Sequence, residues 1–339
     1  MKTIMKDIAK LAGVSPGTVS NTLNKRKGVR KETKERIIKI AEELGYYKKN
    51  GKTESRVIRF IIYKKHGYVV SDTPFFSALI EGIERACRTK GYEMLVSHII
   101  FNEHDNAEIL KIVNENQVAG ILLLATEMSG EDLAPFKNLD IPVVVLDSYF
   151  LDEDFDSILI NNRRGAYQAV KHLIENGHTK IGCLESSKPI NNFAYRVSGF
   201  TEALRDAGIS DTKQYHISLE PTLEGAYRDM KEYLQRKDCN LPTAFFALND
   251  IIAFGAITAM KEQKIKIPEQ VSIIGFDDMP FCEISSPRLT TLRVYKQYMG
   301  ETAITRLIKK ISGQDDRKLT IELNTELILR DSVQNRSLK

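Results

Sequence analysis

The sequence predicts a small all-α head of the helix-turn-helix type, followed by an α/β core of two doubly wound parallel-sheet lobes. Two short helical patterns flank a tight turn within Asp7–Asn24. Positive charge gathers in the same region: residues 1–50 carry 13 Lys and Arg against 5 Asp and Glu, a net +8, whereas the remainder carries 36 against 40, a net −4. From residue 57 onward apolar strand-like runs alternate with helical patterns, which is typical of parallel sheets flanked by helices.

The composition limits the class of protein. A chain of 339 residues, 42% hydrophobic and 28% charged, is long enough for two or three domains. The four cysteines are far apart and form no CxxC pair, so we expect free thiols in a reducing compartment. We find no signal-peptide pattern and no run of membrane-spanning length. We therefore expect a cytoplasmic protein with no membrane partner.

The first helix of the head ends at a sharp turn. Ile8, Leu11 and Ala12 form its apolar face. Gly13 permits the positive φ that a sharp exit from a helix requires. We expect all three apolar side chains to pack inward.

The second helix begins at Ser15, a good N-cap, and Pro16, which is favoured in a first turn. Val19 and Leu23 lie four residues apart and form its inner face. The outward face carries small hydrogen-bonding side chains suited to a DNA major groove. These are Thr18, Ser20, Asn21 and Asn24. The pattern alone fits a structural helical hairpin equally well, and the basic charge favours DNA binding.

A basic loop at residues 25–31, which includes Lys27, suits contact with DNA phosphates. The third helix is expected from Lys31 to Leu44. Its expected inward residues are Ile37, Ile38, Ala41 and Leu44. We place the head at residues 1–47, a polar and basic hinge at 48–56, and the core at 57–339.

The core repeats strand and helix. Strands are expected at Val57–Ile62, Met94–Val96, Gly120–Leu124, Val143–Leu146, Ser157–Ile160, Ile181–Leu184, Ala244–Ala247 and Val271–Phe276. Helices are expected at Phe75–Thr89, Ala107–Asn116, Arg163–Glu175, Phe193–Ala207, Leu223–Arg236, Ile251–Lys261 and Gln297–Ile311. So many strands suit two lobes, with a ligand crevice between them at the carboxyl ends of the strands.

Nearly every expected strand delivers Asp, Asn or Glu at its carboxyl end, as at Asp147, Asn249 and Asp277. Such side chains accept several hydrogen bonds and suit a hydroxyl-rich ligand. Aromatic residues could form walls that stack on a sugar ring. The candidates are Phe75, Phe76, Tyr149 and Phe193. Each polar residue taken singly is equally well explained as a turn former or helix N-cap.

A catalytic reading rests on the pair Asp277–Asp278. The sequence has no phosphate loop, no GxSxG elbow, no HExxH motif and no histidine cluster. We therefore expect a binding protein, not an enzyme, with no cofactor and no metal.

Motifs along the chain resemble the LacI/GalR family of bacterial transcription regulators. The opening IMKDIAKLAGVSPGTVSNTLN is similar to the family's IKDVAKLAGVSxxTVSRVLN and is followed by the family-like KETKERIIKIAEELGY. Later blocks also match: DTPFFSALIEGIE, INNRRGAYQAVKHLIENGHTKIG, FFALNDIIAFGAITAM, IPEQVSIIGFDDMPF and PRLTTLRV. The resemblance implies a periplasmic-binding-protein-like core, with one lobe near 57–161 and 291–320 and the other near 162–290 and 321–339.

The resemblance also implies a function. We expect a homodimer that binds a palindromic operator in double-stranded DNA and is released from it by a small effector, a sugar of a carbohydrate-utilisation operon. The alternative is a corepressor-type regulator, in which a purine, sugar phosphate or partner protein strengthens DNA binding. By position, Arg196 matches the arginine that grips the effector, and Asp277, Asn249 and Asp147 match its further polar contacts. Phe75 and Phe76 match aromatic pocket walls.

Three positions depart from the family pattern. Pro16 and Gly17 stand where base-reading side chains are common, which shifts direct readout to Asn21, Thr18 and close backbone approach at Gly17. In the hinge Asn50 fits the pattern, but Arg56 stands at the position of a groove-wedging leucine. Glu220 replaces an aromatic, and most glutamates face solvent.

Overall fold

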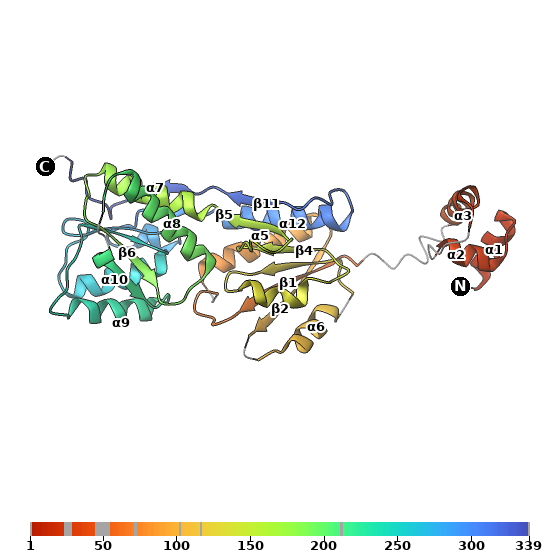
Figure 1. The fold of residues 1–339 in the computed structure, drawn as a ribbon, viewed down its shortest axis with the longest axis horizontal. Helices are drawn as coiled ribbons and strands as arrows, with labels where there is room; N and C mark the ends of the chain where they lie inside the picture. The colour runs from red at the N-terminus through yellow and green to blue at the C-terminus, as the bar shows by residue number, and fades with distance from the viewer. Residues whose placement is uncertain are drawn as a thin grey trace. The chain divides into compact units, whose positions relative to one another are not determined.

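The structure is a computed structural model that describes residues 2–23, 29–44, 55–70, 73–101, 103–115, 117–210 and 213–337. The chain divides into two compact units, Met1–Ser55, called the head here, and Arg56–Lys339, called the core. Figure 1 labels the helices and strands for which there is room. Each unit is described by itself.

The head consists of α1 (Lys2–Ala12), α2 (Pro16–Leu23) and α3 (Lys31–Glu43). Gly13, between the first two helices, has a φ of 64°, as expected for the sharp turn. Ser15 caps α2, because its hydroxyl accepts a hydrogen bond from the Thr18 N–H at 3.1 Å. The head has its own small hydrophobic core, formed by Ile8, Ala9, Ala12, Val19, Ile37 and Ala41.

Three expected core residues of the head face solvent instead: Leu11 is 62% exposed, Ile38 37% and Leu44 42%. In α1 the inward residues follow the helical spacing i, i+3, i+4, i+7 from Met5 to Ala12, and Leu11 lies off this stripe. In α3 the inward stripe runs through Ile37, Ile40 and Ala41.

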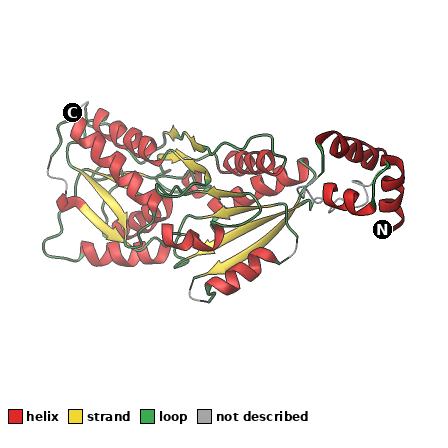
Figure 2. Ribbon diagram, turned by 45° about the vertical axis from the view of Figure 1, so that its right-hand side comes forward, coloured by secondary structure: helices red, strands yellow, loops and turns green. Residues whose placement is uncertain are grey.

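The first lobe of the core contains, within the described residues, a six-stranded sheet in the order β11-β5-β4-β3-β1-β2. Its strands are β1 (Val57–Lys64), β2 (Glu93–Ile100), β3 (Gly120–Leu124), β4 (Val143–Leu146), β5 (Asp156–Ile160) and β11 (Thr320–Leu323). All its pairings are parallel. Its helical elements are α5 (Pro74–Thr89), α6 (Asn106–Asn114), the 3₁₀ element η1 (Gly130–Phe136) and α12 (Lys296–Ile311). Figure 2 shows helices on both sides of the strands.

The two faces of this sheet are buried in separate clusters. Along β1, Phe60 joins the cluster that contains α5 residues, whereas Ile61 joins the cluster that contains α6 residues. This alternation follows from the two-residue period of a strand. Because both faces are covered, β1 is an almost continuous apolar run, as expected for a parallel sheet.

The second lobe contains a parallel sheet in the order β7-β6-β8-β9. Its strands are β6 (Ile181–Ser186), β7 (His216–Leu219), β8 (Ala244–Ala247) and β9 (Ser272–Ile274). Its helices are α7 (Asn162–Glu175), α8 (Asn191–Asp206), η2 (Lys213–Tyr215), α9 (Leu223–Leu234), α10 (Asp250–Glu262) and α11 (Phe281–Ile284). Helix α7 packs against α8, and α9 packs against α10.

The chain passes between the lobes near residues 161, 290 and 324. Two short strands near these passages, β10 (Thr291–Arg293) and β12 (Glu326–Ile328), form an antiparallel pair. The sequence patterns predicted neither these strands nor β7. Because β11 pairs with β5, the last return to the second lobe comes after Leu323, three residues later than expected.

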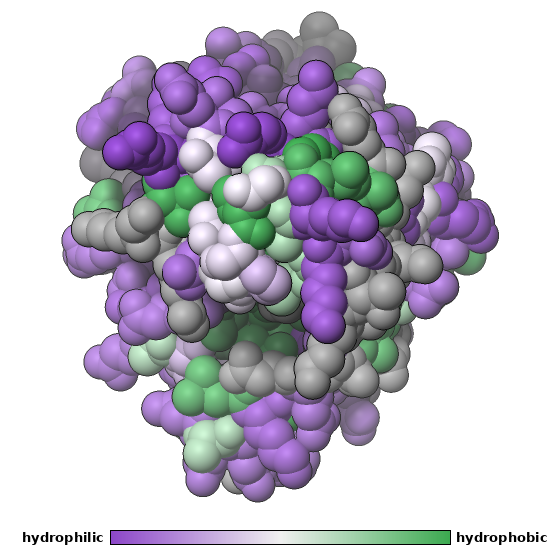
Figure 3. All heavy atoms as spheres, turned by 90° about the vertical axis from the view of Figure 1, so that its right-hand side faces the viewer, coloured by the Kyte–Doolittle hydropathy of each residue, from purple (hydrophilic) through white to green (hydrophobic). Residues whose placement is uncertain are grey.

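No helix among the residues that the structure describes is long and apolar enough to cross a membrane. On the face of the molecule drawn in Figure 3, hydrophilic residues cover most of the surface and hydrophobic ones form small separate areas.

Candidate functional site

The outward face of α2 is the candidate DNA interface. Ser15, Pro16 and Gly17 are exposed, and Thr18, Ser20 and Asn21 are half-buried. All six therefore lie at the surface of the head, while Val19 between them is fully buried.

Part of this face is already ordered by its own hydrogen bonds. The hydroxyls of Ser15 and Thr18 lie 2.9 Å apart, and Thr22 donates its hydroxyl to the Thr18 carbonyl at 2.9 Å. Gly17 presents no side chain, and the nearest atom to a Cβ built there is the Ser15 hydroxyl at 3.6 Å. The backbone at Gly17 is thus open to close approach by another molecule.

Four further residues were predicted to contact DNA. Asn24, Lys27 and Asn50 lie outside the described residues. Arg56 belongs to the core, where its guanidinium donates to the Gly91 carbonyl at 3.5 Å.

The core contains a cavity of about 200 Å³ lined by both lobes, which we call the interlobe pocket. Seven residues predicted as ligand contacts line it. They are Phe75, Phe76, Asp147, Phe193, Arg196, Asn249 and Asp277. They come together because β4, β8 and β9 deliver the polar side chains from their carboxyl ends, as sequence reasoning expected.

Tyr149, the eighth predicted contact, does not line this pocket. It lines a separate surface hollow with Leu151 and Tyr195. Two residues earlier, Asp147 has a positive φ of 63°. Glu220 is also outside the pocket lining: it is half-buried, pairs with Arg228 at 3.3 Å and accepts a hydrogen bond from the Thr222 hydroxyl at 2.8 Å.

Arg196, on α8, is the central cation of the pocket. Only 3% of it is exposed. Its guanidinium donates to Asn162 Oδ1 at 2.8 Å, to the Leu248 carbonyl at 2.5 Å and to Asp277 Oδ1 at 3.3 Å. It also stacks on the Phe276 ring at 3.7 Å. This planar group is fixed on several sides before any ligand arrives.

Asp147 carries an unsatisfied acceptor. Its Oδ2 accepts from the Thr126 hydroxyl at 2.7 Å, but its Oδ1 is buried and has no hydrogen-bond partner. Burial raises the pKa of Asp147 to about 6, against the lowering effects of Thr126 and Arg196. A buried carboxylate oxygen left unpaired is costly, so a donor on a bound ligand would be favourable here.

Asn249 has two roles at once. Its Oδ1 caps α10 by accepting from the Ile252 N–H at 2.9 Å, and the residue also lines the pocket. The two readings that sequence reasoning kept apart for this residue, helix cap and pocket wall, both describe its position.

Asp277 and Asp278 point to different partners. Asp277 pairs with Arg196 in the pocket, whereas Asp278 pairs with Arg293 at 2.7 Å and Arg330 at 2.8 Å. Both residues have positive φ, 116° and 51°. The Lys296 ammonium holds this turn by donating to the carbonyl oxygens of both, at 3.1 Å for Asp278.

Behind the pocket lies another buried carboxylate, Asp250. It accepts hydrogen bonds from the Thr291 hydroxyl at 2.6 Å and the Met279 N–H at 2.9 Å. Burial and the nearby Asp277 carboxylate raise its pKa to about 7. One of these bonds reaches β10 and the other reaches the turn that carries Asp277, so Asp250 links the two.

Sequence reasoning missed several pocket residues. They include Tyr68, Thr126, Ile190, Asn192 and Leu223. Tyr68 lies in a loop, residues 65–70, with no periodic pattern. The loop is held by one carboxylate that is distant in the sequence. Glu127 accepts hydrogen bonds of 2.8–3.0 Å from five backbone N–H groups of the loop.

The pocket combines polar groups with aromatic walls. Its polar groups are a fixed guanidinium and carboxylates with amide neighbours, surrounded by aromatic walls. In the part of the chain that the structure describes, no group of three or more His, Cys, Asp or Glu could hold a metal ion.

Comparison with known proteins finds a matching family model for the head and another for the core. Residues 4–49 match the model of bacterial regulatory proteins of the lacI family, and residues 170–333 match a periplasmic binding protein-like domain. The HTH-type transcriptional repressor PurR of Photobacterium profundum is 32% identical over 339 residues, covering 99% of each chain.

Solved structures share the fold. The transcriptional regulator CelR–cellobiose complex superposes with a TM-score of 0.74 at 23% identity, over 97% of this chain and 99% of that one. A LacI family transcriptional regulator of Enterococcus faecalis V583 with bound ribose has a TM-score of 0.69 at 28% identity, over 82% of this chain and 99% of that one.

The resemblance drawn from the motifs is thereby confirmed, and so is the predicted fold of a helical head and a parallel-sheet α/β core. These matches show that the chain belongs to the lacI family of bacterial regulatory proteins and is a DNA-binding transcription regulator, not an enzyme.

Proposed function

We propose that this protein is a homodimeric repressor whose affinity for a palindromic operator is lowered when a small neutral sugar binds the interlobe pocket. The observation that carries this proposal is the unpaired, buried Oδ1 of Asp147 beside the fixed Arg196–Asp277 pair. A sugar offers several hydroxyl donors and acceptors without bringing a charge into the pocket.

The dimensions and walls of the pocket support a small ligand. Its volume of about 200 Å³ lies below the range of roughly 300–1,000 Å³ typical of drug-sized ligands. Phe75 and Phe76 pack edge to face, with ring centroids 5.0 Å apart, and Phe193 on α8 also lines the pocket. These apolar faces suit the CH face of a pyranose or furanose ring. The ribose bound in the E. faecalis relative supports the same class of ligand.

The ligand would couple the two lobes, because the pocket takes residues from each. Asp147 and Phe75 come from the first lobe, whereas Arg196, Asn249 and Asp277 come from the second. A ligand that contacts both sets favours one relative placement of the lobes over another. The resulting difference in free energy is what would change operator affinity.

On the DNA side we propose direct readout by Asn21, with Ser15, Pro16, Gly17, Thr18 and Ser20 at the groove surface. Asn24, Lys27, Asn50 and Arg56 complete the proposed contacts through phosphates and the hinge. A homodimer would match its two-fold axis to the palindrome. Because it acts on DNA, we propose that the protein works in the cytoplasm.

A second candidate is a corepressor-type regulator in which a purine strengthens operator binding. The aromatic walls favour it, since Phe75, Phe76 and Phe193 could stack on a planar base. Similarity to repressors named PurR supports repression but does not by itself specify the ligand.

A thermal-shift panel distinguishes these ligands. The full-length protein is melted with D-ribose, other pentoses, hexoses, their phosphates, and adenine or guanine. A ligand at about 100 times its Kd stabilises the folded state by about 2.7 kcal/mol. We expect a neutral sugar to give the shift and Asp277→Asn to abolish it. Tyr149→Phe, at the predicted residue outside the pocket, is the matched control and should retain it.

Operator binding completes the test. Operators are selected from random duplex DNA, and their affinity is measured at fixed salt with and without the stabilising ligand. Weaker binding on adding sugar supports the proposal, while tighter binding on adding a purine supports the second candidate. Failure to select any sequence would contradict both.

A further inference from the structure

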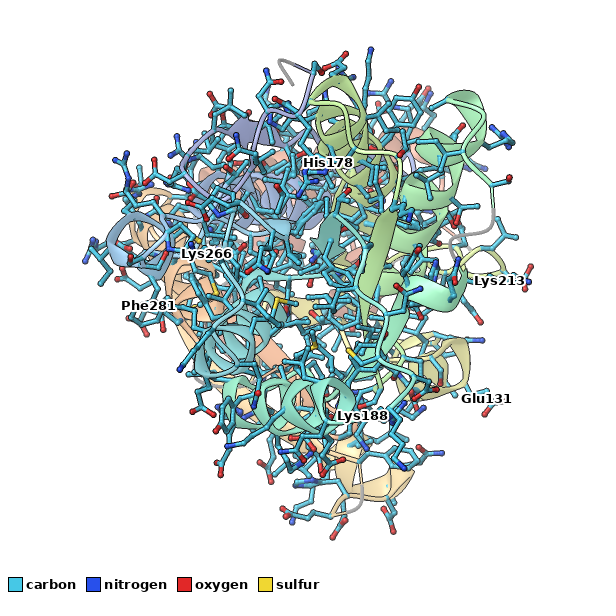
Figure 4. All side chains as sticks on the ribbon, turned by 90° about the vertical axis from the view of Figure 1, so that its left-hand side faces the viewer. Glu131, His178, Lys188, Lys213, Lys266 and Phe281 are labelled. Atoms are coloured by element: carbon cyan, nitrogen blue, oxygen red, sulfur yellow. The ribbon has the colours of Figure 1, made fainter. Side chains whose placement is uncertain are left out.

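Among the contacts that join the two lobes beside the interlobe pocket, which include hydrogen bonds from Asn191 and Asn192, one is a cation–π contact. The Lys188 ammonium lies 4.6 Å from the centroid of the Tyr68 ring. Tyr68 lines the pocket from the first lobe, and Lys188 follows β6 in the second lobe, two residues before the pocket residue Ile190. Both are half-buried. Figure 4 labels Lys188 in the second lobe.

The backbone around Tyr68 is fixed by hydrogen bonds to the carboxylate of Glu127. Glu127 Oε2 accepts from the N–H groups of Lys65, His66 and Gly67, and its Oε1 accepts from those of Val69 and Val70. The side chain of Glu127 is fully buried. The loop around Tyr68 is therefore preformed, and the ring is presented at a fixed place.

The backbone that carries Lys188 is held as well. The Ser186 hydroxyl accepts from the Lys188 N–H at 3.0 Å and donates to the Lys188 carbonyl at 2.8 Å. This clamp closes the turn between β6 and α8. Two rigid supports on opposite lobes thus bring a cation and an aromatic face together.

We propose that Tyr68 and Lys188 form a latch that closes the interlobe pocket and sets the rate at which small molecules enter and leave it. The identity of the natural ligand rests on the proposed function, whereas the latch rests on this interlobe contact alone. The pair neither lies among the predicted ligand contacts nor carries the buried charges of the pocket. Its role is to hold the lobes together at that edge.

The expected size of the effect is modest and measurable. A cation–π contact at a solvent-accessible site changes an equilibrium by about two- to five-fold. Removing either partner should raise the open fraction of the pocket by that factor. Removing both should do no more than removing one, because the same contact is lost.

The test uses a reporter thiol inside the pocket and needs no effector. Met279 lines the pocket and is 1% exposed, so Met279→Cys places a thiol that reagents reach only when the pocket opens. The full-length variant is treated with iodoacetamide, and the modified peptide is followed by mass spectrometry. Because residue 279 and the native Cys282 fall on one tryptic peptide, fragment-ion spectra assign the label to one or the other, and Cys87, Cys183 and Cys239 lie on other peptides.

The reporter substitution Met279→Cys is combined with Lys188→Met, with Tyr68→Leu and with both substitutions together. Each should label about two to five times faster than the reporter alone, and all three by the same factor. The matched control is Lys231→Met, because Lys231 lies 5.1 Å from the Tyr227 ring on the same helix, α9, so that this cation–π contact stays within the second lobe. This control should label at the reference rate.

A second reporter, Ile251→Cys, guards against a variant of Met279 that does not fold, since Ile251 also lines the pocket but is half-buried. Unchanged labelling in the latch variants at both reporters would refute the proposal. Acceleration of the same size by Lys231→Met would also refute it. So would faster labelling in Tyr68→Leu if labelling in Lys188→Met stays at the reference rate. Because no sugar is present, these results are independent of the ligand panel.

Discussion

Ionised Glu127 is expected to contribute strongly to the free energy of unfolding of the core. Its carboxylate is fully buried, which alone would raise its pKa, but hydrogen bonds from the His66 ring and from backbone N–H groups lower the pKa to about 2 from its ordinary 4.5. One pKa unit corresponds to about 1.4 kcal/mol, so ionised Glu127 should stabilise the folded core by about 3 kcal/mol near pH 7.

The perturbation is Glu127→Gln, which keeps the shape and replaces one acceptor oxygen by an NH₂ group. If the NH₂ group takes the place of Oε2, three backbone N–H groups lose their acceptor. If it takes the place of Oε1, two do. We expect the free energy of unfolding to fall by about 3 kcal/mol, measured by urea denaturation at pH 7 with far-UV circular dichroism.

The pH dependence supplies the second half of the test. A carboxylate with a lowered pKa stabilises the fold above its unfolded-state pKa, and this stabilisation is lost as pH falls from about 4.5 toward 2. The wild type should lose stability over this window more steeply than Glu127→Gln. Glu131→Gln, at an exposed residue marked in Figure 4, is the control and should behave as the wild type. If Glu127→Gln lowers the free energy of unfolding by less than about 1 kcal/mol, the anchoring role assigned to Glu127 is wrong.

Three further predictions follow from other parts of the molecule. Asn21→Ala should relax the preference at one operator base pair by ~1–3 kcal/mol in competition binding, whereas Lys27→Ala should weaken binding evenly across sequences. Burial raises the pKa of Asp147 to about 6, so calorimetric affinity for the ligand should decline as pH drops through 6, and Asp147→Asn should remove that dependence. Gly199→Ala should lower the free energy of unfolding by about 1–3 kcal/mol in urea, since its Cβ would lie 2.0 Å from the Arg163 carbonyl where α7 and α8 meet. Gly130→Ala, with no atom within 4 Å of the new Cβ, should leave it unchanged.

Much of the pocket was predictable because one topological rule locates it. In a parallel sheet the carboxyl ends of the strands share an edge, so polar residues that follow separate strands meet there. Asp147, Asn249 and Asp277 were found in this way, and the buried strands themselves were visible as apolar runs. Arg196 needed the family resemblance, because no strand delivers it.

What the sequence could not reveal depends on contacts between distant residues. Tyr68 enters the pocket only because Glu127, some sixty residues away, folds its loop. The strands β10 and β12 are three residues long and carry too little pattern to be recognised. Leu11 was misassigned because an apolar residue next to a helical stripe looks like part of it until the partner helices are in place.

The double role of Asn249 has a consequence for engineering ligand-responsive switches from this scaffold. A side chain that both caps α10 and lines the pocket cannot be exchanged to suit a new ligand without also weakening the helix, by typically about 1 kcal/mol. Leu223 and Ile251 line the same cavity from positions that cap no helix. Specificity should therefore be easier to redirect at those two walls, in biosensor libraries and in natural divergence alike, while residue 249 stays fixed.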